Sequence, residues 1–192
     1  MIAHLDWARD GADWPNRDAS RFVDAAGMVW HVQIMGQGPV ILLLHGTGAS
    51  THSWRDILPK LADRFTVVAP DLPGHGFTAD PPASAQSLPG MASAVADLLR
   101  KLGLMPFRGV GHSAGAAVLV RMTVRKMIAP DDIVSFNGAF FPVSGVAGHF
   151  FTPLAKAAAA TSFMPKLFAS MADQKAVERL LKDTGSKIDA RG

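Results

Sequence analysis

One serine in this sequence stands where a nucleophile would be exposed. It lies at the centre of a G-x-S-x-G motif made of Gly111, His112, Ser113, Ala114 and Gly115. A serine at a tight turn from a strand to a helix occupies strained backbone, and neighbours without side chains let the chain turn and leave Oγ exposed. The helix N-terminus would then face any negative charge that forms there. We expect Ser113 to attack a carbonyl carbon; the alternative is a plain tight turn.

A second segment could stabilise the oxyanion that such an attack creates. It follows an aliphatic run and consists of His45, Gly46, Thr47 and Gly48. Two backbone N–H groups aimed at an oxyanion contribute several kcal/mol to acyl transfer. We assign these donors to Ala114 and Thr47, with Gly48 as the alternative for the second. His45 could be a general base, but a histidine directly after a strand more often orders the loop.

Residues 71–76, Asp-Leu-Pro-Gly-His-Gly, form a third polar motif after another apolar run. Because Asp side chains bond nearby backbone N–H groups and glycine permits tight turns, the motif favours a structured loop. We therefore treat Asp71 and His75 as scaffold rather than as catalytic groups.

The same region allows a second interpretation, as a dinucleotide-binding site. Gly46 and Gly48 follow a predicted strand, and Asp71 closes the next strand twenty residues beyond Thr51, where a ribose-binding acid would stand. Thr51, however, stands where the third glycine belongs, and this interpretation leaves the serine motif unexplained. Binding of a nicotinamide cofactor in a titration would support it.

The elements that position these motifs alternate between strand and helix. Arg21–Ala25 and Met28–Ile34 are predicted to form a hairpin whose turn is Ala26-Gly27. Val40–Leu44 is typical of a strand covered on both faces. The further predicted elements are a helix from Ser53 to Ala62, a strand Phe65–Ala69, a helix Leu88–Leu102 with Ser87 as its cap, a strand Phe107–Val110, a helix from Gly115 to Met127 and a strand Ile133–Phe136.

This alternation predicts an α/β fold with a mostly parallel, doubly wound sheet, an antiparallel N-terminal hairpin and flanking helices. From Gly138 onward the pattern changes to Phe and Ala with scattered Pro, followed by an amphipathic stretch, Met171–Lys182. We expect residues 1–137 to be a core and residues 138–192 to begin a helical cap. Without further strands, the edge at Ile133–Phe136 would be exposed and prone to aggregation.

Composition excludes several classes of protein. There is no cysteine, so disulfides, thiolate catalysis and cysteine-bound zinc are excluded, and no other metal ligand set is visible. The 19 Lys and Arg against 16 Asp and Glu leave a net charge of only +3, which does not indicate a nucleic-acid partner. Charges within Met1–Asn16 exclude a secretory signal, and the apolar stretch Gly138–Ala155 is broken by Pro and Gly, unlike a transmembrane helix. We expect a cytoplasmic protein, with contact to a membrane surface left open.

In order along the chain, the motifs H-G-x-G, D-x-P-G-H-G and G-H-S-x-G follow a hairpin, and together they resemble the α/β-hydrolase superfamily over roughly Arg21–Asn137. Three segments are similar to a narrower group, the magnesium chelatase accessory proteins of the BchO type: Leu5–Gly11 with Trp14–Asn16, His45–Ala49 with Ser53–Asp56, and Gly111–Ala117. The resemblance implies a serine esterase without a cofactor, or an accessory role beside magnesium insertion in bacteriochlorophyll synthesis, with magnesium chelatase subunits as partners.

The superfamily's order of nucleophile, acid and histidine implies that both remaining triad members follow Ser113. His149 is the only histidine beyond Ser113, and it stands too early to match the superfamily's catalytic position. Asn137 stands where some relatives carry the acid, but an amide cannot stabilise an imidazolium as a carboxylate does. We expect the final strands, the acid and the histidine to lie beyond this chain, which would then be inactive alone.

A non-catalytic module remains the alternative to a hydrolase. A hydrophobic cap that contains Phe140, Phe141, Phe150 and Phe151 could shelter a flat tetrapyrrole as readily as an acyl chain. Such a module would hold a tetrapyrrole or a partner subunit without cleaving a bond. The substrate itself is therefore either a small ester-like molecule or a tetrapyrrole-related one.

Overall fold

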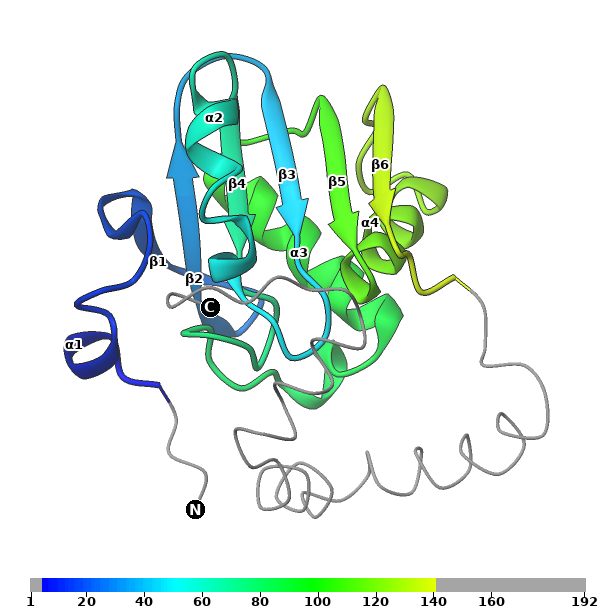
Figure 1. The fold of residues 1–192 in the computed structure, drawn as a ribbon. Helices are drawn as coiled ribbons and strands as arrows, with labels where there is room; N and C mark the ends of the chain where they lie inside the picture. The colour runs from blue at the N-terminus through cyan, green and yellow to red at the C-terminus, as the bar shows by residue number, and fades with distance from the viewer. Residues whose placement is uncertain (1–4, 141–192) are drawn as a thin grey trace. The chain divides into compact units, whose positions relative to one another are not determined.

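A computed structural model describes residues 5–140 of the chain, and in this part six strands form one sheet in the order β1-β2-β4-β3-β5-β6 (Figure 1). The strands are β1 (Ser20–Ala25), β2 (Met28–Met35), β3 (Val40–Leu44), β4 (Thr66–Pro70), β5 (Arg108–His112) and β6 (Asp132–Phe136). Strand β3 runs parallel to β4 and β5, and β5 runs parallel to β6, whereas β2 is antiparallel to both β1 and β4. The predicted mixed sheet with an antiparallel hairpin is confirmed.

The hairpin turn between β1 and β2 uses two residues in the left-handed region. Ala26 has φ 51° and Gly27 has φ 76°. Positive φ at both central residues defines a type I′ turn, whose twist matches that of paired strands. The predicted turn at Ala26-Gly27 is therefore correct, although Ala26 occupies a conformation that favours glycine or asparagine.

The helices within residues 5–140 are α1 (Trp7–Asp10), α2 (Leu58–Ala62), α3 (Leu88–Leu102) and α4 (Ala114–Val124), with 3₁₀ turns η1 (Arg17–Ala19), η2 (Thr51–Trp54) and η3 (Ala83–Ala85). Helix α3 has the predicted bounds. The Ser87 side chain accepts a hydrogen bond from the Gly90 N–H, and Gly103 ends the helix with φ 68°. Both ends thus use the residues that sequence rules favour there.

The predicted helix from Ser53 to Ala62 is wrong in its first half. The chain forms η2 and only then α2, and Ser50 rather than Ser53 caps η2 by accepting from the His52 N–H at 3.3 Å. Helix α2 starts at Leu58, with Pro59 in its first turn, where proline is well tolerated. Ile57, between the two pieces, is 42% exposed, whereas a continuous helix would place it on one face with the buried Trp54 and Leu58.

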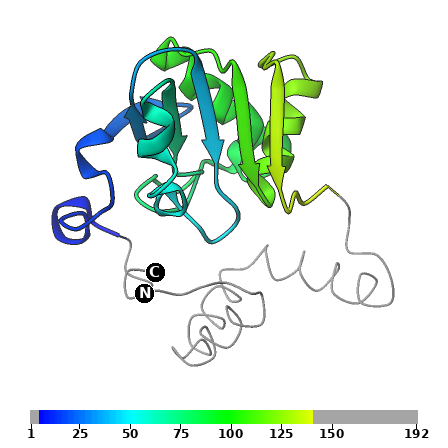
Figure 2. The ribbon, with the colours of Figure 1, turned by 45° about the horizontal axis from the view of Figure 1, so that its top comes forward.

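The aliphatic run of β3 is buried on both faces of the sheet. Leu42 and Leu44 belong to the apolar cluster that contains α3 and α4, whereas Ile41 and Leu43 pack with Trp54 and Leu58 on the opposite face. Figure 2 shows the sheet between α3 and α4 on one side and α2 on the other. The two-sided burial explains why β3 has no alternation of polar and apolar residues.

Strand β6 pairs with β5, and no second neighbour of β6 lies within the described range. Val134 and Phe136 are 44% and 50% exposed. The expected cap from residue 138, with Met171–Lys182 and His149, falls outside the described residues apart from its first three positions. In residues 5–140 no helix has both the length and the hydropathy that a membrane span requires.

Candidate active site

Ser113 occupies strained backbone between β5 and α4. Its φ of 50° and ψ of −116° lie in a region that side-chain-bearing residues rarely adopt. The Ser113 N–H donates to the Phe136 carbonyl at 2.9 Å, and the Ser113 carbonyl accepts from Ala116 and Ala139 at 3.2 and 3.1 Å. Hydrogen bonds from α4 and from the end of β6 therefore hold the serine in this conformation.

The two glycines of the motif are required by close backbone approach rather than by φ. A Cβ on Gly111 would lie 2.4 Å from Ala116 Cα, and a Cβ on Gly115 would lie 2.3 Å from the Leu44 carbonyl oxygen. Contacts shorter than 3.0 Å to backbone atoms force the backbone to shift. The motif therefore lets α4 begin directly against β5 and the end of β3, which is the geometry of a sharp strand-to-helix elbow.

The loop after β3 runs beside the serine. A Cβ on Gly46 would lie 3.0 Å from Ser113 Cβ and 3.0 Å from His112 Nδ1. Gly46 is followed by a turn in which the Ala49 N–H donates to the Gly46 carbonyl and Gly48 has φ 74°. The structure thus brings together Gly46, His112 and Ser113, and it places Thr47 and Gly48 in a turn that starts at this contact.

His45 uses both ring nitrogens within the fold. Its Nδ1 donates to the Gly46 carbonyl at 2.8 Å, and its Nε2 accepts from the Leu72 N–H at 2.8 Å. Burial is the main cause that lowers the pKa of His45 to about 4, although the hydrogen bond to Gly46 opposes it. His45 is therefore neutral near pH 7 and links the loop after β3 to the loop after β4.

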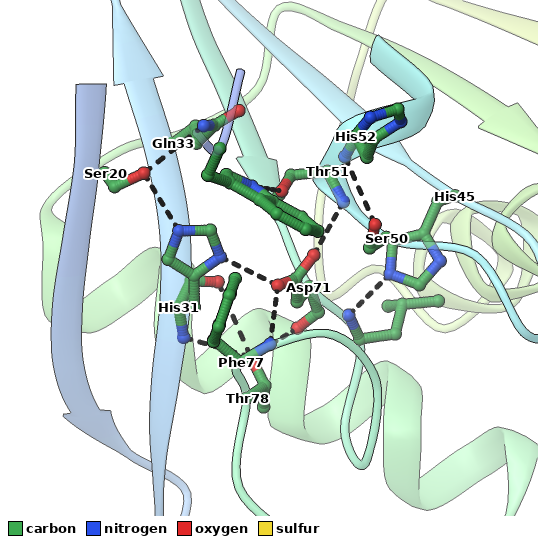
Figure 3. A network of polar contacts seen from close by, with 12 residues as sticks. Ser20, His31, Gln33, His45, Ser50, Thr51, His52, Asp71, Phe77 and Thr78 are labelled. Carbon is green, nitrogen blue, oxygen red and sulfur yellow. Dashed lines mark hydrogen bonds and ion pairs between the residues drawn. The ribbon is translucent and has the colours of Figure 1, made fainter. Parts of the chain in front are cut away.

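Asp71 is completely buried at the end of β4 (Figure 3). Its Oδ1 accepts from the Thr51 N–H at 2.6 Å, and its Oδ2 accepts from the Phe77 N–H at 3.0 Å and lies 2.7 Å from His31 Nδ1. Burial alone raises the pKa of Asp71, but the interactions with His31 and the two N–H groups outweigh it and lower the pKa. Because these contacts engage both oxygens, Asp71 has none free for the ribose of a dinucleotide.

The partner of Asp71, His31 on β2, is a residue that sequence reasoning missed. His31 is fully buried, and its Nε2 lies 2.9 Å from Ser20 Oγ. Rings of Trp7, Trp14, Phe22 and Phe77 surround it, with ring centroids 5.1 to 6.4 Å from its own. A histidine within the β-prone run Met28–Ile34 is the available sequence signal, but nothing local points to Asp71, 40 residues further on.

The N-terminal segment is hydrogen-bonded to η2 and β2, close to His31 and Asp71. Trp14 Nε1 donates to Thr51 Oγ1 at 3.1 Å, and Gln33 Nε2 donates to the carbonyl oxygens of Pro15 and Asn16. Residues 14–16 therefore lie against η2 and β2. The sequence predicted no ordered element before Arg21, whereas the structure has α1 and η1 there.

The general base and the triad acid are not found near Ser113 in the described range. No side chain of residues 5–140 forms a hydrogen bond with Ser113 Oγ, His149 lies outside this range, and Asn137 follows β6 with φ 47°. The His75 ring is tilted by 58° against the His45 ring, with ring centroids 5.3 Å apart, and His75 Nδ1 bonds the Pro73 carbonyl. Among the same residues no group of three His, Asp or Glu side chains could hold a metal ion.

Comparisons with known proteins agree with this geometry. A family model described as the alpha/beta hydrolase family matches residues 41–188. The chain is 37% identical over 184 residues to the magnesium-chelatase 30 kDa subunit of Rhodobacter capsulatus, covering 94% of this chain and 64% of that subunit. It is 35% identical over 119 residues to a fluoroacetate dehalogenase from Burkholderia sp, covering 60% of this chain and 38% of that enzyme.

Among solved structures, an alpha/beta hydrolase fold protein from Burkholderia ambifaria matches with a TM-score of 0.64 and 25% identity. The match covers 96% of this chain and 60% of that protein. The chain thus spans less than two thirds of the length of each of these three relatives.

Proposed function

Because the chain belongs to the alpha/beta hydrolase family, we propose that it carries the nucleophile of a serine hydrolase that cleaves carboxylic esters. The observation that carries the proposal is the strained backbone of Ser113 at the elbow between β5 and α4, with Gly46 packed against it. Strain of this kind persists where surrounding contacts enforce it, and such sites are often functional. A serine at such an elbow exposes its hydroxyl, as nucleophilic catalysis requires.

The oxyanion donors follow from the position of Ser113 at the start of α4. Ala114 is the first residue of this 11-residue helix, so its N–H has no partner within the helix. The positive end of the helix dipole lies at the same place. Thr47 supplies the second N–H from the loop after β3, with Gly48 as the alternative donor, because Gly46 of that loop already contacts Ser113.

The reaction proceeds in two halves. In the first, Ser113 Oγ attacks the ester carbonyl while a histidine removes its proton, and the oxyanion forms between the N–H groups of Ala114 and Thr47. The ester C–O bond then breaks, the histidine gives its proton to the departing alcohol, and an acyl-enzyme remains. In the second, water attacks the acyl group and gives a proton to the histidine, the bond to Ser113 Oγ breaks, the carboxylic acid is released, and the histidine returns the proton to Ser113 Oγ. We place the histidine and its acid outside residues 5–140, and no step needs a metal or an organic cofactor.

A fluorophosphonate probe tests the proposal in the full protein. Wild-type protein should form a covalent adduct at Ser113, and Ser113→Ala should abolish it. Ser93→Ala is the matched control, since Ser93 is an exposed residue of α3 whose Oγ donates to the Pro89 carbonyl. If folded wild-type protein does not label, or if labelling survives Ser113→Ala, the proposal is wrong.

A second candidate function is a non-catalytic module that binds a tetrapyrrole or a magnesium chelatase subunit during bacteriochlorophyll synthesis. The observation that favours it is the similarity to the magnesium-chelatase 30 kDa subunit over 94% of this chain. Such a protein would work in the cytoplasm or at a membrane surface. Full retention of magnesium insertion into protoporphyrin by Ser113→Ala would support the module, and loss of it would support catalysis.

A further inference from the structure

The contacts around Asp71 form a continuous chain from the hairpin to the loop beside Ser113 (Figure 3). Gln33 Nε2 donates to Ser20 Oγ at 3.2 Å, and Ser20 Oγ lies 2.9 Å from His31 Nε2. When the Ser20 hydroxyl donates to Nε2, His31 Nδ1 carries the proton that it donates to Asp71. Ser20 Oγ, both ring nitrogens of His31 and both carboxylate oxygens of Asp71 then have partners, which favours a stable buried network.

Asp71 connects this buried network to the loop after β3. That loop is tied to the segment after β4 at both of its ends: His45 Nε2 accepts from the Leu72 N–H, and the Thr51 N–H donates to Asp71 Oδ1. Asp71 Oδ2 in turn accepts from the Phe77 N–H. Between the two ties lie Gly46, against Ser113, and Thr47.

We propose that His31 is a positioning residue for the nucleophile: through Asp71 it fixes the loop of residues 45–51 so that the Thr47 N–H faces the oxyanion formed at Ser113. The inference rests on the proposed hydrolase function. Without the imidazole, the Asp71 carboxylate loses one of its three hydrogen-bond donors and can rotate away from the Thr51 N–H. An oxyanion donor acts fully only when its position is fixed before the reaction, so even a displacement of about 1 Å is costly.

Three variants of the full protein separate this role from general stability. His31→Leu removes both ring nitrogens, whereas His31→Asn keeps an amide N–H near the position of Nδ1. Leu99→Ala is the control, because Leu99 is fully buried on α3 and its truncation destabilises the core away from the chain of contacts. The measurements are kcat and KM for a small ester and hydrogen exchange of residues 46–51.

His31→Leu should lower kcat about 10- to 100-fold with little change in KM, and it should accelerate exchange of residues 46–51 at least about tenfold. His31→Asn should recover most of both losses, and Leu99→Ala should show neither effect where it is folded. Unchanged exchange in His31→Leu, or an equal loss of kcat in Leu99→Ala, would overturn the inference. The exchange experiment tests the effect of His31 on the loop and does not depend on catalysis. Full activity of Ser113→Ala would refute the hydrolase proposal but would leave the exchange result unchanged.

Discussion

Replacing Gly115 by alanine tests whether the spacing between α4 and β3 positions the nucleophile. The added Cβ would lie 2.3 Å from the Leu44 carbonyl oxygen and 2.5 Å from the His45 carbonyl oxygen. Ordinary contact begins at 3.4 Å, so the start of α4 must move by 3.4 − 2.3 = 1.1 Å or the end of β3 must give way. Overpacking of this kind costs about 1–3 kcal/mol, of which roughly 1 kcal/mol is offset because alanine favours helix.

Gly115→Ala should affect the rate of reaction at Ser113 more than it affects the free energy of unfolding. A shift of about 1 Å at the elbow carries Ser113 Oγ and the Ala114 N–H away from the loop after β3, and misplacement of that size lowers the rate about 100-fold. We expect the unfolding free energy in urea to fall by at most roughly 2 kcal/mol, and the rate of fluorophosphonate labelling to fall about 100-fold.

Gly109→Ala is the matched control. Its Cβ would also be crowded, at 3.1 Å, but only by the Leu119 side chain, which can move. It should label at nearly the wild-type rate. If Gly115→Ala labels as fast as Gly109→Ala, or if its crystal structure shows α4 unmoved, the reasoning from backbone contact is refuted.

Two further predictions concern pH and the sheet edge. Because burial lowers the pKa of His45 to about 4 in the folded state, its contribution to stability is present above the unfolded value near 6.5 and is lost as pH falls toward 4, up to about 3 kcal/mol. Urea unfolding between pH 7 and 4 should show this slope in wild-type protein and a weaker one in His45→Gln, and equal slopes would contradict it. Val134→Lys, at an exposed position on β6, should slow the aggregation of this chain in light scattering; an unchanged rate would show that this edge does not drive association.

Local signals in the sequence predicted several features well. Helix α3 could be bounded because Ser87 and Gly103 mark its ends within the segment itself. The serine motif predicted the elbow because its glycines are demanded by contacts that occur wherever a helix turns back onto its own strand.

Other features depend on partners distant in the sequence and could not be predicted. The N–H of Thr51 bonds to Asp71, 20 residues away, and η2 starts at this residue where the sequence predicted a helix from Ser53. His31 owes its burial to Asp71 and to rings contributed by the N-terminal segment, none of which leaves a mark near residue 31. The roles assigned to Thr47, Gly48 and Ala114 stay predictions.

The strain at Ser113 has a consequence for how this sequence would change if selection for chemistry were relaxed. Glycine adopts positive φ without the cost that serine pays there, on the order of 1–3 kcal/mol. A chain kept only as a scaffold would therefore gain stability from drift to glycine at position 113, by a substitution that removes a single side chain. The serine at this position is the less stable choice, and its presence in this sequence accords with a hydroxyl that is in use.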